Sequence, residues 1–212
     1  MIAALAWREL RRGWTSGGVM LPVAFFLLVA VLFPFAIGPD AALLARVGGG
    51  VVWAAALLAA LLPVERLVAP DVDSGVIDQL GVRGVPMALV AFAKLVGHWL
   101  GFAPPLMLAA VVAAGLLGMS GETLLRVEIG LLIGTPGLAA LGVATASLVA
   151  GLRGAGALAG LIMLPFAVPL VIFGAGALDG GVGALKLLAA VSLVLVAGAP
   201  FVAGAAIRMG RE

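Results

Sequence analysis

The chain has 212 residues, of which 64% are hydrophobic and 10% are charged. A soluble domain carries roughly 45–50% apolar and about 25% charged residues, and a disordered chain is still more polar, so both classes are excluded. The formal net charge is +2, and no basic block follows the N-terminal one, so a nucleic-acid-binding surface is excluded as well. A mean hydropathy of +1.30 indicates an integral membrane protein.

The apolar residues form long runs rather than the alternation of a membrane β-barrel. We therefore predict an all-α integral membrane protein, with residues 1–212 forming a single transmembrane domain. At roughly 20 residues per membrane span, the length allows about six helices. The expected spans are residues 18–38, 47–64, 91–118, 127–150, 157–178 and 184–207.

Residues 1–16 are the most polar opening segment and are predicted to form an amphipathic helix. Its apolar side carries mainly aliphatic side chains and Trp14, and its other side carries Arg8, Arg11 and Arg12. Such a helix suits the surface of an anionic membrane leaflet. Glu9 interrupts the apolar side, and a basic flank that only sets the topology is the alternative.

The distribution of basic residues predicts the orientation, because cytoplasmic segments are enriched in Lys and Arg. With the N-terminus in the cytoplasm, nine basic residues lie inside and three lie outside, and an even number of spans places the C-terminus inside too. The inside set is Arg8, Arg11, Arg12, Arg66, Arg83, Lys94, Arg153, Arg208 and Arg211, and the outside set is Arg46, Arg126 and Lys186.

Glycine and proline predict the local breaks. Asp179-Gly180-Gly181 should separate the last two spans, and residues 134–137, which include Pro136, should kink or unwind the fourth span. Glycines four residues apart share one helix face and allow close helix packing. Such pairs are Gly97 with Gly101, Gly130 with Gly134, and Gly156 with Gly160.

Residues 65–85 form the longest polar stretch and are predicted to be a cytoplasmic coupling loop. Aspartates alternate there with apolar residues, which predicts a short amphipathic helix beginning near Asp71 or Ser74, with Ser74 as a possible cap. A helix with an apolar face suits a groove on a cytosolic partner. Resting on the bilayer is the alternative, although anionic lipid repels an acidic face. The expected docking residues are Asp71, Asp73, Ser74, Gly75, Ile77, Asp78, Gln79 and Leu80.

No catalytic or metal-binding constellation is visible in the sequence. The chain has no Cys and a single His, which cannot supply the usual ligands of a metal, and it has no nucleotide-binding loop. We therefore expect a non-catalytic protein. Lys94 and His98 lie one turn apart in an apolar run and form a possible intramembrane polar site. His98 could contact a haem, a lipid headgroup or a partner helix, but an imidazole satisfied by a neighbouring helix is the favoured interpretation.

Several short motifs occur along the chain in a fixed order. They are Leu32-Phe33-Pro34-Phe35-Ala36-Ile37-Gly38-Pro39-Asp40, Trp53-Ala54-Ala55, Glu65-Arg66-Leu67, Ile77-Asp78-Gln79-Leu80, Ala93-Lys94-Leu95, His98-Trp99, Leu117-Gly118-Met119, Gly134-Thr135-Pro136 and Pro169-Leu170-Val171-Ile172-Phe173. This series resembles the haem exporter protein B (CcmB) family, the membrane component of the ATP-binding-cassette (ABC) complex for cytochrome c maturation. In the loop, Pro70 and Ser74 stand where the family usually has acidic residues.

The resemblance implies a six-helix, ABC permease-like protein in the bacterial inner membrane. It implies docking to a cytosolic ABC ATPase (CcmA-like) and assembly with a haem-handling membrane protein (CcmC-like) and its small helper (CcmD-like). ATP hydrolysis would then release a haem chaperone (CcmE-like) in the periplasm. No cofactor is expected on this chain itself, since partners hold the ATP and the haem. Cassette ATPases act in pairs, which implies two copies of this chain.

Three functions stay open from the sequence. The chain could couple ATP hydrolysis in a partner to chaperone release, it could be a true conduit for haem or another hydrophobic substrate, or it could be a scaffold that only recruits partners. A polar cavity in mid-membrane would favour a conduit, and stimulation of the ATPase would distinguish coupling from scaffolding.

Overall fold

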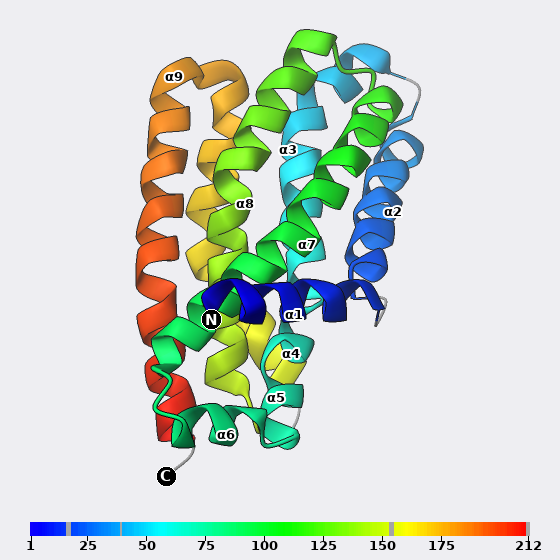
Figure 1. The fold of residues 1–212 in the computed structure, drawn as a ribbon. Helices are drawn as coiled ribbons and strands as arrows, with labels where there is room; N and C mark the ends of the chain where they lie inside the picture. Colours follow the sequence, from blue (N-terminus) through cyan, green and yellow to red (C-terminus); the bar gives the residue numbers. More distant parts are fainter. Residues whose placement is uncertain (16–17, 39, 153–154, 211–212) are drawn as a thin grey trace.

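The computed structural model describes residues 1–15, 18–38, 40–152 and 155–210, so Arg153, Arg211 and Pro39 lie outside the described residues. Within these ranges every regular element is a helix, which confirms the all-α fold. Five of the helices stand side by side as a bundle (Figure 1). Those five are long and apolar enough to cross a membrane: α2 (Met20–Ile37), α3 (Ala41–Leu61), α7 (Met87–Leu116), α8 (Gly121–Val149) and α9 (Ala155–Met209).

Helix α9 has 55 residues, and at 1.5 Å per residue a straight helix of that length would measure about 80 Å, far more than one crossing needs. It is not straight, because Gly181 has φ 60° and ψ −145°, a conformation that glycine adopts readily. Figure 1 shows two arms of α9 running side by side, coloured yellow and orange. The expected break at residues 179–181 is therefore present. That the chain crosses the membrane six times stays a prediction.

Two side-chain caps mark helix starts at the same end of the bundle. Asp40 accepts a hydrogen bond from the Leu43 amide at 2.9 Å at the start of α3, and Ser120 accepts one from the Thr123 amide at 3.2 Å at the start of α8. Such caps satisfy amides that have no partner in the first turn. Helix α8 continues through Gly134 and Pro136, so the expected local unwinding there is absent.

Trp53 of α3 lies at the centre of the bundle and is fully buried. Its ring occupies a socket of glycines: a Cβ atom at Gly130 would lie 3.3 Å from the ring, and Cβ atoms at Gly134 and Gly174 would overlap it. The predicted contact at Gly130 and Gly134 is confirmed. Of the third predicted pair, Gly156 faces Glu65, whereas nothing lies within 4 Å of a Cβ at Gly160.

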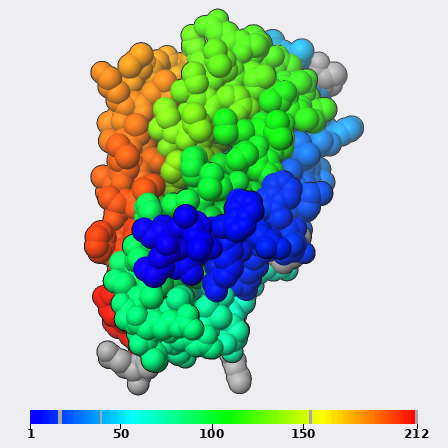
Figure 2. All heavy atoms as spheres, viewed as in Figure 1, coloured from blue at the N-terminus to red at the C-terminus, as the bar shows by residue number. Residues whose placement is uncertain are grey.

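Helix α1 (Ile2–Thr15) lies crosswise over the bundle rather than along it (Figures 1 and 2). It packs on α7 through the first predicted glycine pair, since a Cβ at Gly97 would lie only 2.6 Å from the Ala6 carbonyl oxygen. Trp7 and Trp14, seven residues apart and so on one side of the helix, are 61% and 57% exposed. The amphipathic helix is therefore present, and its position at a membrane surface stays a prediction.

The polar stretch at residues 65–85 contains three short helices instead of the single one expected: α4 (Val64–Leu67), α5 (Ala69–Asp73) and α6 (Val76–Val82). Gly75, with φ +71°, turns the chain between α5 and α6. Ser74 does not cap α6, because its hydroxyl donates to the Pro70 carbonyl at 2.7 Å and closes α5 instead. Figure 1 shows α4 to α6 gathered at one end of the bundle, beyond α1.

Candidate functional site

A buried charge cluster lies where α1, α5 and α7 meet. Asp71 of α5 and Lys94 of α7 are 3% and 2% exposed, and they form an ion pair. The Lys94 ammonium also donates to Glu9 Oε2 at 3.1 Å and to the Leu67 carbonyl oxygen at 2.9 Å. One lysine thus joins three segments that are far apart in the sequence.

Two arginines of α1 complete the cluster from its outer side. Arg8 Nη2 lies 2.6 Å from Asp71 Oδ2, and Arg12 Nη1 lies 2.9 Å from Asp71 Oδ1. Arg8 also contacts Glu9 at 2.6 Å. The two arginines are one turn apart on α1, so a single helix face presents both guanidinium groups to one carboxylate. We call these five residues, Arg8, Glu9, Arg12, Asp71 and Lys94, the charge cluster.

The cluster keeps Asp71 ionised. Burial by itself raises the pKa of Asp71, because a buried carboxylate loses its hydration. The charges of Lys94, Arg8 and Arg12 outweigh this effect and hold the pKa of Asp71 below its ordinary value. Asp71 therefore carries its negative charge at neutral pH and binds α5 to both α1 and α7.

Sequence reasoning found Asp71 and Lys94 but not their relationship, and it missed Glu9, Arg8 and Arg12 as site residues. A signal was present. Glu9 interrupts the apolar side of an amphipathic helix and Lys94 interrupts an apolar run, and buried charges require opposite charges nearby. Glu9 and Lys94 could therefore have been predicted from the sequence to form an ion pair.

The residues expected to dock to a partner fall into two groups. Asp71 and Ile77 are buried within the chain, at 3% and 2% exposure, and Leu80 packs against the core. These three face the bundle and attach the loop to the spans, and their insertion into a partner stays a prediction. The outward-facing members are Asp73, Ser74, Asp78 and Gln79, while Gly75 is half-buried.

Two exposed apolar side chains accompany this outward face. Val72 on α5 is 37% exposed, and Val82 at the end of α6 is 87% exposed. Neither was among the expected anchors, because the sequence pattern alone did not show which side of each short helix faces out. Docking itself stays a prediction, now centred on the outward face formed by Val72, Asp73, Asp78, Gln79 and Val82.

Lys94 and His98 lie on the same helix but have different surroundings. Lys94 belongs to the charge cluster, whereas the His98 ring stacks on Phe102 with a centroid distance of 5.6 Å. No hydrogen bond to His98 from a neighbouring helix is present among the described residues, so the favoured interpretation of His98 is not seen. His98 instead lines a cavity of about 340 Å³ between α1, α2, α4 and α7. Within the described ranges, no three potential metal-ligating side chains come together.

Comparison with known proteins gives consistent matches over nearly the whole chain. The family model of the CcmB protein matches residues 1–210. The protein named heme exporter protein B of Rhodobacter capsulatus is 40% identical over 213 residues, covering 97% of this chain and 98% of the relative. The proteins of the same name from Paracoccus denitrificans and Escherichia coli K12 are 40% and 37% identical, and cover 97% and 92% of this chain. With a family model and full-length relatives in agreement, the chain belongs to the CcmB protein family.

Proposed function

We propose that this chain is the membrane subunit of an ABC-type complex for haem export and cytochrome c maturation. In this role it couples ATP hydrolysis by a cytosolic partner to release of a haem-loaded periplasmic chaperone. Membership of the CcmB family and the name heme exporter protein B of its relatives support the system. The lack of a nucleotide-binding loop in the sequence agrees with ATP hydrolysis by another chain.

The proposed subunit crosses the bacterial inner membrane six times, with both termini in the cytoplasm. The two arms of α9 on either side of Gly181 supply the fifth and sixth crossings. The end of the bundle that carries α1 and α4 to α6 bears most of the basic residues and is assigned to the cytoplasm. At the opposite end, Arg46 and Arg126 share a cavity of about 520 Å³ with Asp179.

The observation that carries the coupling role is the buried pair of Asp71 and Lys94. A force on the outward face of α5 and α6 reaches α7 through this pair and reaches α1 through Arg8 and Arg12. Separating buried opposite charges leaves each one uncompensated and is costly, so the contact resists being pulled apart. The loop therefore moves together with α7 when a partner pushes it.

The proposed partners are a CcmA-like ATPase on the outward face, and CcmC-like, CcmD-like and CcmE-like proteins for the haem. Because cassette ATPases act in pairs, two copies of this chain are proposed in the complex. The alternative, a haem conduit, has weaker support: the cavity that contains His98 lies beside α1 and α4 at one end of the spans, whereas a conduit must continue to the other end.

The test compares binding of the ATPase with release of the chaperone. Replacing Lys94 with Met removes the cation of the buried pair while leaving the outward face unchanged. The complex should still co-purify with the ATPase, but ATP-dependent release of the haem chaperone should fall to background. A variant complex that releases the chaperone at the wild-type rate would exclude coupling through this pair. Failure of any ATPase to co-purify with the wild-type chain would overturn the proposed function itself.

A further inference from the structure

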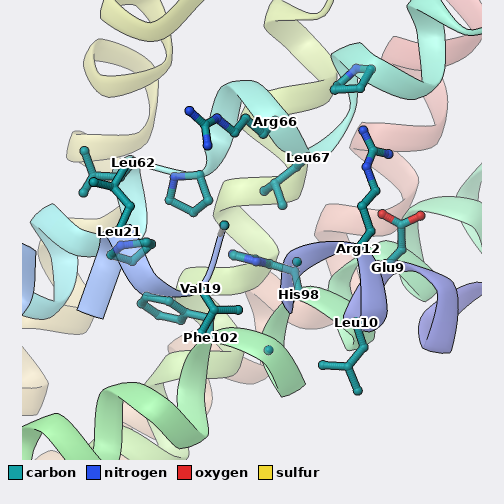
Figure 3. A pocket seen from close by; sticks show the side chains of 17 residues that line it. Glu9, Leu10, Arg12, Val19, Leu21, Leu62, Arg66, Leu67, His98 and Phe102 are labelled. Atoms are coloured by element: carbon teal, nitrogen blue, oxygen red, sulfur yellow. The ribbon is translucent and has the colours of Figure 1, made fainter. Parts of the chain in front are cut away.

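The cavity that contains His98 combines charged and apolar walls at the level of α1 (Figure 3). Its walls are formed by residues of α1, the start of α2, the junction between α3 and α4, and α7. We propose that it binds one anionic phospholipid of the cytoplasmic leaflet, with the headgroup phosphate beside Arg66 and Arg12 and an acyl chain along the apolar wall.

The polar wall carries the charge that such a headgroup requires. Arg66 is exposed and makes no ion pair within the described part of the chain. Arg12 lines the same cavity and also pairs with Asp71, so phosphate binding rests chiefly on Arg66. The carboxylate of Glu9 is the acidic group in the lining, and its charge is offset by Lys94 and Arg8. The guanidinium group of Arg66 matches a phosphate well, because its planar donors fit two oxygens at once.

The apolar wall provides a path for a hydrocarbon chain. Val19 and Phe102 are buried at 7% and 3% exposure, whereas Leu21 is 49% exposed at the outer edge. Figure 3 shows Arg66 and Arg12 in its upper part, with Leu21, Val19 and Phe102 to the left and below. The cavity therefore offers two arginines and, on its lower left side, a continuous apolar surface, which suits a molecule with a charged headgroup and a hydrocarbon tail.

The position of the cavity agrees with a lipid of the cytoplasmic leaflet. It lies under α1 and next to α4, at the end of the bundle that the proposed orientation places in the cytoplasm. Headgroups of anionic lipids attract basic side chains at this level of a membrane. An inorganic anion would use the arginines but not the apolar wall, and that difference separates the two ligands experimentally.

The experiment measures lipid binding by the delipidated full-length chain in detergent, using native mass spectrometry. Phosphatidylglycerol and phosphatidylcholine with identical acyl chains are the probes. The chain should retain one phosphatidylglycerol and no phosphatidylcholine. Arg66→Gln should weaken binding about tenfold, the effect of losing one charge-assisted hydrogen-bonding group. The matched control is Arg11→Gln, which removes an exposed cation of α1 outside the cavity and should leave binding unchanged.

A second variant tests the apolar wall without depending on charge. Leu21→Trp places a large ring at the half-exposed edge and should lower phosphatidylglycerol binding while thermal unfolding stays as in the wild type. Equal binding of both lipids, or equal effects of Arg66→Gln and Arg11→Gln, would overturn the proposal. The proposal would also be overturned if inorganic phosphate alone raised the melting temperature as much as the lipid does. Displacement of the lipid by hemin in the wild type but not in His98→Ala would assign the cavity to haem instead.

Discussion

Lys94 and Asp71 form an ion pair in which the two side chains are 2% and 4% exposed, although one belongs to a long helix of the bundle and the other to a short helix of the polar loop. The pair fixes the loop to α7 from inside the protein. This geometry separates the residues that hold the loop in place from those that face outward. The two groups should respond differently to substitution.

Asp71→Asn should destabilise the chain by about 3–5 kcal/mol, because it leaves Lys94, Arg8 and Arg12 with less negative charge to balance them. Reversible unfolding in mixed micelles measures this change. Asp73→Asn, on the exposed side of α5, is the matched control and should change stability by less than about 0.5 kcal/mol. Replacing Asp71 with Leu and Lys94 with Met together should recover most of the loss, since the two most buried charges are then both removed while Glu9 keeps its pair with Arg8. Equal stability of Asp71→Asn and Asp73→Asn would show that the cluster does not hold the fold together.

The cluster also predicts a pH dependence. The pKa of Asp71 is lowered in the folded protein, so its contribution to stability is present at all pH values above the ordinary aspartate pKa of about 4. That contribution is lost as pH falls through the folded pKa, because the unfolded chain then binds the extra proton more readily. In thermal unfolding experiments, the melting temperature should decrease as the pH drops below about 4. The Asp71→Asn chain should lack this part of the acid dependence, and an identical acid slope in both chains would contradict the assignment.

Docking of the ATPase should depend on the outward face. Val82→Asp and Val72→Asp should each abolish recovery of the ATPase in pull-down experiments, because a few apolar anchors usually carry most of an interface energy. Asp73→Asn should have a mild, salt-dependent effect. Ile77→Asp should behave differently and reduce the amount of folded protein in the membrane, since Ile77 is buried at 2% exposure. Wild-type ATPase recovery with both valine variants would show that the partner binds elsewhere.

The glycine socket around Trp53 makes a separate prediction about packing. Gly174→Leu should prevent α9 from approaching α3, because a side chain there would overlap the indole ring. Loss of the folded protein, read from fluorescence-detected gel filtration, is the expected result. Gly176→Ala is the control on the same helix, since nothing lies within 4 Å of the added methyl. Similar elution profiles for both variants would show that the socket is not tightly filled.

The proposed topology can be tested at the bend in α9. A reporter active only in the periplasm, inserted next to Asp179, should be active, and a reporter active only in the cytoplasm should be active at the C-terminus. A periplasmic C-terminus would exclude the topology with six crossings. The prediction rests on the two arms that meet at Gly181.

Much of the fold follows from local sequence. Long apolar runs specify helices, Gly181 specifies a turn that other residues adopt with difficulty, and glycines four residues apart mark close contacts such as those at Gly97 and Gly134. These features depend on short stretches of chain. Each can therefore be derived from spacing and residue type alone.

The site required information that local sequence does not hold. The alternation of aspartates and apolar residues at 71–80 is compatible with either side of the helix facing out, and the choice depends on where Lys94 lies in space. Because Gly75 divides the segment into α5 and α6, no single helical face joins Asp71 to Leu80. Which side chains of α5 and α6 face outward thus depends on a tertiary contact as well as on the amphipathic pattern.

The charge cluster joins segments that are synthesised at different times. Glu9 leaves the ribosome 85 residues before Lys94, its partner in α7. Until that lysine has been synthesised with its helix, α1 lacks the α7 surface on which it packs, and Asp71 can pair only with Arg8 and Arg12. The short helix α5 consequently gains its contact with α7 only after the third long helix has been made, and the loop meets residues of α8 and α9 later still. The place of this loop against the bundle is therefore fixed by a helix that is synthesised after it.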